Sequence, residues 1–335
     1  MILVGRALPL FAGLMIVGIV VLSYSVALLI PGQVGGNPIF ESTVKGAKEM
    51  AQKLGIDLKV VEAGYNMSRW GSILMGLSAT GKYDLIITLT EGMPENVEKS
   101  ARMFPRIKYA IIDGVSRSKL PNVFSIGFRD EEMSFLAGYF AGLVTTSSME
   151  NSNSDLKVGL IAGDIYPTMM RKIKPGFENG AKAVNEEIKV LFSVVGSWHD
   201  PKKGEELAEM MFKEGVDVVF MVAGGSNAGI IRKAEDMKKY LIGVDANIIH
   251  LSPNTILACV LKRCDLAVKY IMEKAYEGKL KFGTFEIWGV KEGAIDFTFD
   301  DPNYLRNVPN DIRVKMKGIY EELKKGLISP LGSSK

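Results

Sequence analysis

Histidine and cysteine are scarce in this chain of 335 residues, which has only two of each. Disulfide frameworks and cysteine-rich zinc sites need more cysteines, and most histidine-based metal sites need more histidines. Serine and cysteine nucleophiles usually depend on a histidine base, so the scarcity of histidine also disfavours this kind of catalysis. The composition therefore points away from an enzyme, and we expect no catalytic residues, no bound metal and no cofactor.

The few histidines and cysteines also lack suitable partners along the chain. Cys259 and Cys264 flank a predicted strand-to-helix junction, a poor geometry for a disulfide, so we expect two free buried thiols. His199 and His250 have no second ligand at metal-binding spacing. The chain also lacks a large net charge: its 41 basic and 38 acidic residues give +3, and no cluster of Lys and Arg residues stands out in the sequence. We therefore expect no nucleic acid as a partner.

One apolar run near the N-terminus, over residues 7–30, is almost uninterrupted and follows a single arginine. A hydrophobic segment of about 18–25 residues can cross a bilayer, and the arginine fits the positive-inside rule. We expect a membrane helix over about 7–22 and a buried strand over 26–30, with residues 1–25 acting as a signal peptide or membrane anchor. No A-x-A cleavage site is evident, and both alternatives stay open. The rest of the chain is expected outside the cytoplasm, either tethered to the cell membrane by this helix or secreted.

Two parts of the chain resemble each other at an offset of about 133 residues. GAKEMAQKLGIDLKVVEAGYN, from Gly46, matches GAKAVNEEIKVLFSVVGSW, from Gly180, and GKYDLIITLTEG, from Gly81, matches EGVDVVFMVAGG, from Glu214. Short β-branched runs alternate with amphipathic stretches, which predicts a parallel α/β sheet with helices on both faces in each copy. The predicted strands are 58–61, 85–88, 109–112, 158–162, 190–195, 218–222 and 241–244, and the Ser/Asn-rich stretch 146–156 is expected to run between the two lobes.

Ligands of open parallel sheets bind beyond the carboxyl ends of the strands, so a cleft between two such lobes is the expected site. Aromatic residues at strand ends would hold a flat ligand between their rings, and carboxylates there would accept hydrogen bonds from a vicinal diol. The alternatives are core packing for the rings and helix or hinge capping for the carboxylates, while a basic residue after strand 256–261 would pair with a carboxylate or reach the ligand. The candidate ligand-binding residues are Asn37, Phe40, Asn66, Asp113, Tyr166, Trp198, Gly225, Asn227, Asp245 and Lys262.

Several segments, in order from about Ile30 to Phe297, resemble one known family: PGQVGGNPIFESTVKGAKEMA, KYAIIDG, FLAGYFAGLV, PGFENGAK, GSWHDPKKG, DVVFMVAGGSNAGII, GVDAN and GVKEGAIDF. The chain is similar to the basic-membrane-protein or PnrA-like family, substrate-binding proteins of ABC importers that typically carry purine nucleosides. The resemblance implies a type I periplasmic-binding-protein fold with two lobes and a hinge. We assign 26–128 plus 255–285 to the first lobe and 129–254 plus 286–335 to the second.

The resemblance also implies roles for individual residues. By matched motif, Asp245 in GVDAN would hold the ribose hydroxyls, Asp113 in IIDG would line the cleft, and Lys262 matches the family's basic position. The first loop departs from the nucleoside binders, which show an acidic residue where this chain has 36–40 (GNPIF). PGQVGGNPIFE, GYNMSRW and IYPTMMRKIKPGF look more similar to the riboflavin-binding branch of the family. A purine nucleoside and riboflavin are therefore both expected ligands, and a flat heteroaromatic ring bearing a polyol is their common feature.

Three functions follow as hypotheses. The first is an extracytoplasmic solute receptor that delivers its small-molecule ligand to an ABC transporter permease, with the N-terminal helix as its tether because no lipid-modifiable cysteine lies near that end. The second is a ligand-sensing ectodomain for a signalling partner. The third is an extracytoplasmic nucleoside hydrolase, which the lack of a histidine base and of clustered carboxylates in the sequence disfavours.

Overall fold

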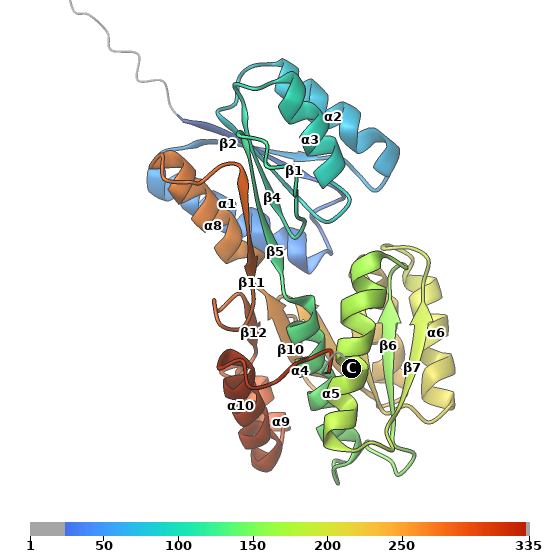
Figure 1. Ribbon diagram of the computed structural model, residues 1–335. Coiled ribbons are helices and arrows are strands. Elements are labelled where there is room, and N and C mark those ends of the chain that lie inside the picture. Colours follow the sequence, from blue (N-terminus) through green and yellow to red (C-terminus); the bar gives the residue numbers. More distant parts are fainter. Residues whose placement is uncertain (1–23, 333–335) are drawn as a thin grey trace, which may run out of the picture.

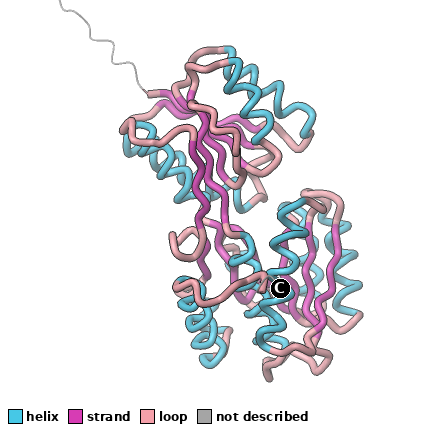
Figure 2. The backbone as a smooth tube through the Cα atoms, viewed as in Figure 1, coloured by secondary structure: helices cyan, strands magenta, loops and turns pink. Residues whose placement is uncertain are grey.

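The computed structural model describes residues 24–332, which form two lobes that Figure 1 shows one above the other. The predicted membrane helix over 7–22 lies outside the described residues. Within residues 24–332, no helix is long and apolar enough to span a bilayer. Figure 2 shows the strands of each lobe at its centre with helices around them.

The first lobe is built on a six-stranded sheet in the order β11-β5-β4-β3-β1-β2, in which every neighbouring pair is parallel. The apolar run that ends the predicted membrane segment forms the strand expected there, and its residues after Ser25 are fully buried. The strands are β1 (Ser25–Ile30), β2 (Asp57–Glu62), β3 (Leu85–Leu89), β4 (Lys108–Ile112), β5 (Val123–Phe128) and β11 (Thr284–Trp288), and the helices are α1 (Pro38–Leu54), α2 (Met67–Ala79), α3 (Pro94–Met103) and α8 (Cys264–Tyr276).

The second lobe repeats this plan with a sheet in the order β12-β10-β9-β8-β6-β7. Each position matches the corresponding strand of the first lobe, which confirms the predicted α/β fold in two repeated halves. One difference lies at the edge, where β12 is antiparallel to β10. The strands are β6 (Lys157–Ala162), β7 (Lys189–Val194), β8 (Val218–Val222), β9 (Tyr240–Asp245), β10 (Ile256–Lys262) and β12 (Ile295–Phe297), and the helices are α4 (Asp130–Thr145), α5 (Lys174–Val184), α6 (Pro201–Lys213), α7 (Asn227–Asp236), α9 (Pro302–Asn307) and α10 (Asn310–Lys324), with short turns η1 (Met169–Ile173), η2 (Gly224–Ser226) and η3 (Ile249–Leu251).

The chain passes between the lobes three times: from β5 to α4, from β10 to α8, and from β11 to β12. These crossings correct the predicted lobe boundaries. Residues 255–285 were assigned to the first lobe, but β10 pairs with β9 and belongs to the second sheet. Residues 286–288 were assigned to the second lobe, but they end β11, which pairs with β5 in the first sheet. The stretch 146–156 connects α4 to β6 inside the second lobe and does not run between the lobes.

Close packing of α4 against α5 explains two of the glycine-containing motifs. A Cβ atom at Gly138 would lie 2.0 Å from the Phe177 carbonyl oxygen, and one at Gly180 would lie 2.2 Å from the Phe135 carbonyl oxygen. Only a residue without a side chain allows the two helix backbones to come this near. The contact fixes α4 in the second lobe directly after the first crossing, so the first turn of α4 lies at the boundary between the lobes.

Candidate ligand-binding site

The carboxyl ends of the strands of both sheets lie at the boundary between the lobes. Three residues that directly follow or end these strands have left-handed backbones: Thr90 (φ 77°), Asp113 (φ 58°) and Asp245 (φ 71°). A non-glycine residue adopts this conformation at a cost of about 1–3 kcal/mol, and such strain is often found where side chains are held for binding. The backbone therefore places both predicted carboxylates at this edge in an unusual conformation.

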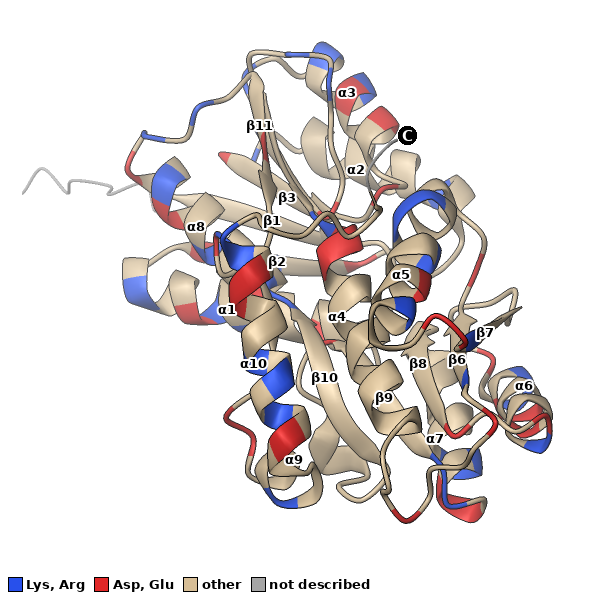
Figure 3. Cartoon of the chain, turned by 60° about the horizontal axis from the view of Figure 1, so that its bottom comes forward, with Lys and Arg blue, Asp and Glu red and all other residues tan. Residues whose placement is uncertain are grey.

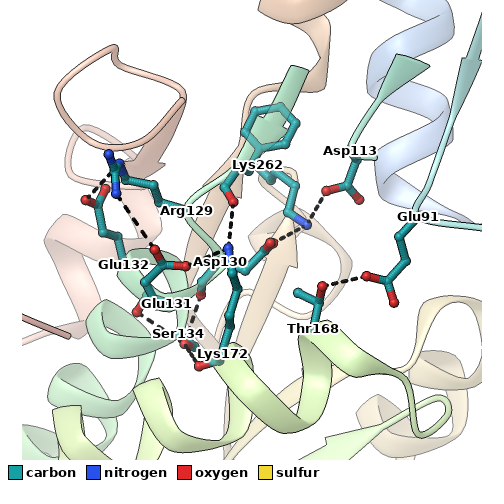
Figure 4. A network of polar contacts seen from close by, with 11 residues as sticks. Glu91, Asp113, Arg129, Asp130, Glu131, Glu132, Ser134, Thr168, Lys172 and Lys262 are labelled. Carbon is teal, nitrogen blue, oxygen red and sulfur yellow. Dashed lines mark hydrogen bonds and ion pairs between the residues drawn. The ribbon is translucent and has the colours of Figure 1, made fainter. Parts of the chain in front are cut away.

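Contacts between the lobes occur along the same edge. The Lys262 ammonium of the second lobe lies 3.0 Å from the Asp113 carboxylate of the first. On other loops, the rings of Tyr65 and His199 stack with centroids 4.5 Å apart and planes at 16°. Thr168 donates a hydrogen bond of 2.5 Å to Glu91, which is visible in Figure 4. The loops that follow β2, β3 and β4 thus face the second lobe directly.

Lys262 lies at the centre of a buried charge cluster (Figure 4). Its ammonium is 2.7 Å from Asp130 Oδ1 and 3.0 Å from Asp113 Oδ1. The side chains of Lys262 and Asp130 are each 8% exposed and that of Asp113 is 20% exposed. The ring of Phe128 lies 5.8 Å from the Lys262 nitrogen. A single cation therefore holds two carboxylates that come from different lobes.

The pKa values of these groups reflect burial first and their mutual charges second. Burial raises the pKa of Asp113 from 3.8 to about 7, although the Lys262 ammonium acts in the opposite direction. Burial also raises the pKa of Asp245, again against the effect of Lys262. For Lys262 itself, burial lowers the pKa, but Asp113, Asp130 and Asp245 together outweigh it and raise the pKa above its usual value. The lysine is therefore a permanent cation at neutral pH.

Asp245 differs from Asp113 in lacking any direct partner. Within residues 24–332, no hydrogen-bond donor and no ion pair reaches its carboxylate, although it is only partly exposed. Asp113 in turn uses one carboxylate oxygen for Lys262. A partly buried carboxylate without donors is costly, and hydroxyl groups of a bound molecule would satisfy it. The two residues together offer free oxygens at the lobe boundary.

Two aromatic rings lie beside this cluster. The centroids of Tyr166 and Trp198 are 5.8 Å apart, with planes inclined by 51°. Burial raises the pKa of the Tyr166 hydroxyl, the Lys262 ammonium acts against this, and the carboxylates of Asp130, Asp113 and Asp245 add to it, so the hydroxyl lies within electrostatic reach of the cluster. Trp198 packs on Gly163, where a Cβ atom would lie 2.5 Å from the indole ring. We call Asp113, Asp130, Tyr166, Trp198, Asp245 and Lys262 the interlobe site.

The other predicted residues have different surroundings. Phe40 is buried, and its ring lies 2.6 Å from the position of a Cβ on Gly32. Asn37 is buried near Gly224 of the other lobe. Gly225 adjoins the Trp198 carbonyl oxygen.

Two of the predicted asparagines use their side chains locally. Asn66 is exposed and caps α2, where its Oδ1 accepts hydrogen bonds from the Ser68 backbone N–H and hydroxyl group. Asn227 is buried, and its Oδ1 accepts from the Ala223 N–H. In both residues the side-chain oxygen is therefore hydrogen-bonded within its own turn.

A hollow of about 250 Å³ adjoins the interlobe site next to Asp245. Residues of α1 from the first lobe and the end of β9 from the second lobe line it, so it too lies between the lobes. Its walls carry charges of both signs, and several of these are already paired, as Lys269 is with Glu49 and Arg263 with Asp265.

Comparison with known proteins identifies the family. The Bmp family, described as "ABC transporter substrate-binding protein PnrA-like", matches residues 23–326. The chain belongs to the Bmp family. This assignment confirms the resemblance drawn from the sequence motifs. As substrate-binding components of ABC transporters, Bmp proteins bind a small molecule outside the cytoplasm, work with a membrane permease and are not enzymes.

Relatives and solved structures agree with this assignment. This Bmp protein is 29% identical over 310 residues to "Basic membrane protein D" of Borreliella burgdorferi, covering 91% of this chain and 86% of the relative. It is 28% identical over 236 residues to "ABC transporter nucleoside-binding protein BmpA" of Lactococcus lactis, covering 65% of this chain and 64% of the relative. A crystal structure of an ABC transporter solute-binding protein from Aeropyrum pernix is similar with a TM-score of 0.83 and 26% identity, covering 91% of this chain and 92% of that one.

Some residues at the lobe boundary of this Bmp protein were not among the ligand-binding residues predicted from the sequence. Asp130 was missed because it begins a helix with three consecutive acidic residues, a pattern that suits any helix N-terminus. Tyr65 and Glu91 fall in loops after β2 and β3, where the sequence does place candidates, but neither was chosen as a ligand-binding residue because neither residue type marks a site by itself. Their position after parallel strands was the one available signal.

Proposed function

We propose that this Bmp protein binds a planar heteroaromatic molecule that carries a polyol, with a purine nucleoside as the first choice. The observation that carries the proposal is the pair of carboxylates with free oxygens, Asp113 and Asp245, beside the rings of Tyr166 and Trp198. An aromatic ring stacked on a flat base contributes about 0.5–1.5 kcal/mol beyond the burial of its surface. The hydroxyl groups of a ribose would supply the donors that Asp245 lacks.

The name of the Lactococcus lactis relative adds support for a nucleoside, since that protein is described as nucleoside-binding. Riboflavin is the second candidate, because it presents the same two features: a flat ring system and a chain of hydroxyl groups. The loop before α1 favours it, since Asn37 and its neighbours in GGNP offer no carboxylate for a purine base. Both ligands would use the interlobe site in the same way.

We infer that the protein delivers this ligand to an ABC permease while residues 1–25 tether it to the membrane or direct its secretion. Ligand that contacts both lobes would favour the closed arrangement, in which Lys262 reaches Asp113 across the boundary. A sensory ectodomain would bind the same molecule but report it to a signalling partner. Vesicles containing the matching permease would distinguish the two, because transport of ligand into the vesicles is expected only for the receptor of an importer.

Mass spectrometry of the small molecules released from purified protein, together with their absorbance spectrum, tests the ligand directly. A purine nucleoside is expected, and riboflavin would show itself by its yellow colour. Calorimetry with adenosine, inosine, guanosine and riboflavin then gives affinities, with Trp198→Ala as the variant expected to bind weakly. A bound molecule with neither a flat ring system nor vicinal hydroxyl groups would contradict the proposal.

A further inference from the structure

The first turn of α4 carries three adjacent carboxylates: Asp130, Glu131 and Glu132. The turn follows the first crossing between the lobes, and Figure 3 shows this end of α4 in red beside the first lobe. Acidic residues are favoured at helix N-termini by the helix dipole, so the turn by itself asks for no special explanation. The partners of the three side chains, however, are different.

Asp130 is directed at Lys262. The distance between its Oδ1 and the lysine nitrogen is 2.7 Å, and both side chains are 8% exposed. It does not cap its own helix, since the N-cap position is Arg129 and no side-chain cap is present there. The carboxylate is therefore committed to the ammonium group.

The two neighbouring carboxylates point elsewhere, as Figure 4 shows. Glu131 pairs with Lys172 at 3.1 Å, and Glu132 accepts a hydrogen bond of 2.7 Å from the Val290 N–H at the third crossing. Neither makes an ion pair or hydrogen bond with Lys262. Glu131 therefore offers a matched comparison for Asp130: the same helix turn, the same charge and a different cation.

Asp130 and Lys262 both belong to the second lobe, whereas Asp113 belongs to the first. The Asp130–Lys262 pair is thus internal to one lobe, and the Lys262–Asp113 pair joins the two. A lysine ammonium is a compact charge on a flexible four-carbon stem, and without a fixed partner it would move among the nearby carboxylates. Asp245 and the second oxygen of Asp113 would then be covered by the lysine.

We propose that Asp130 is a positioning residue: it fixes the Lys262 ammonium so that Asp245 and one oxygen of Asp113 stay free for ligand hydroxyl groups. The proposal rests on the proposed function, in which these oxygens receive the ligand. It adds a residue outside the strand-end loops, located at the first crossing, that acts on the ligand through Lys262 alone.

Calorimetry with adenosine and with riboflavin on four variants tests this role. Asp130→Asn is expected to weaken binding about ten-fold, whereas Glu131→Gln, which makes the same change of charge on the same helix turn, is expected to bind within two-fold of wild type. Lys262→Met is expected to bind weakly because it removes the ammonium that joins Asp113 of the first lobe to the second lobe. Because Asp130 acts through Lys262, the double variant Asp130→Asn/Lys262→Met is expected to bind like Lys262→Met. Losses that multiply in the double variant, or an equal loss in Glu131→Gln, would overturn the proposal.

A second measurement needs no ligand and separates this proposal from the ligand assignment. In nitrogen-15 NMR spectra of the full chain, the Lys262 ammonium is expected to exchange its protons slowly with water in wild type and in Glu131→Gln, and to lose this protection in Asp130→Asn. Retained protection in Asp130→Asn would overturn the positioning role. If neither adenosine nor riboflavin binds the wild type while the protection pattern holds, the ligand assignment fails and the role of Asp130 in fixing Lys262 stands.

The carboxyl titration of Asp113 gives an additional readout. Lys262, Asp130 and Asp245 are the charged groups that act on it. Since Asp130 raises the pKa of Asp113, Asp130→Asn is expected to move the Asp113 midpoint to lower pH in carbon-13 spectra, and Glu131→Gln is expected to leave it in place. An unchanged midpoint in Asp130→Asn would contradict the arrangement of charges on which the proposal depends.

Discussion

Asp113→Asn is expected to remove a pH dependence of stability that the ligand-free protein owes to one carboxylate. Burial raises the pKa of Asp113 from 3.8 to about 7. Between these two values the folded protein holds a proton that the unfolded chain has released. Folding stability therefore falls as the pH rises through this window and is constant, for this group, above about pH 7.

The magnitude follows from the width of the window. Each pKa unit corresponds to about 1.4 kcal/mol, so between pH 5 and the pKa of Asp113 the wild type loses about 3 kcal/mol of unfolding free energy through this group. An asparagine of the same shape carries no charge at either pH. The variant is therefore expected to be more stable than wild type at pH 8 and close to wild type at pH 5.

Urea denaturation of the ligand-free protein at pH 5 and pH 8 measures this difference. Other carboxylates also titrate, so the quantity of interest is the wild-type change between the two pH values minus the change in the variant. Asp164→Asn is the matched control, because Asp164 is an exposed aspartate in the loop after β6 whose Oδ1 accepts from its neighbour's N–H. If Asp113→Asn and wild type lose stability equally between pH 5 and pH 8, the reasoning about the buried carboxylate is wrong.

Three further predictions concern ligand binding. Trp198→Ala is expected to weaken the binding of the preferred ligand by about 1–3 kcal/mol in calorimetry, because a stacking ring is lost; an unchanged affinity would remove the ring from the site. Asp245→Ala is expected to weaken binding by a similar amount while leaving the protein folded, as circular dichroism checks, and wild-type affinity would refute its role toward the ligand hydroxyl groups. Tyr65→Ala removes the stack on His199 across the lobe boundary, so stopped-flow measurements are expected to show ligand dissociating several-fold faster; an equal rate would show that this contact does not hold the lobes together.

The fold could be predicted largely because each half repeats the other. The strand over residues 26–30 is apolar throughout, as a central parallel strand covered on both faces must be, and it is fully buried. The same pattern in 85–88 and 218–222 gives equivalent strands, β3 and β8, beside β1 and β6 in the two sheets. Local apolar pattern and repetition were sufficient because neighbouring strands in these sheets have similar surroundings.

The crossings could not be read in the same way. β11 has an exposed start and no fully buried residue, and it joins a sheet whose other strands end more than a hundred residues earlier. Nothing in a short, mixed segment specifies which sheet edge it will extend, because edge pairing depends on distant parts of the chain. For the same reason, β10 was assigned to the first lobe, although its buried residues pair with β9.

The interlobe site shows the same division between local and distant causes. Asp113 and Asp245 could be found as carboxylates that end or follow buried strands, because a buried carboxylate loses its hydration and needs a hydrogen-bond or ion-pair partner in any tertiary structure. Asn66 was chosen from its place after a strand, but an asparagine there serves equally well as the cap of the next helix, and it does cap α2. Asp130 was hidden because its partner, Lys262, is 132 residues away in sequence and reaches it only after the second lobe has folded. A carboxylate at the end of a buried strand can thus be recognised from sequence, because burying its charge without a partner costs free energy in any fold. The residue that pairs with it can be distant in sequence and is found only in the folded structure.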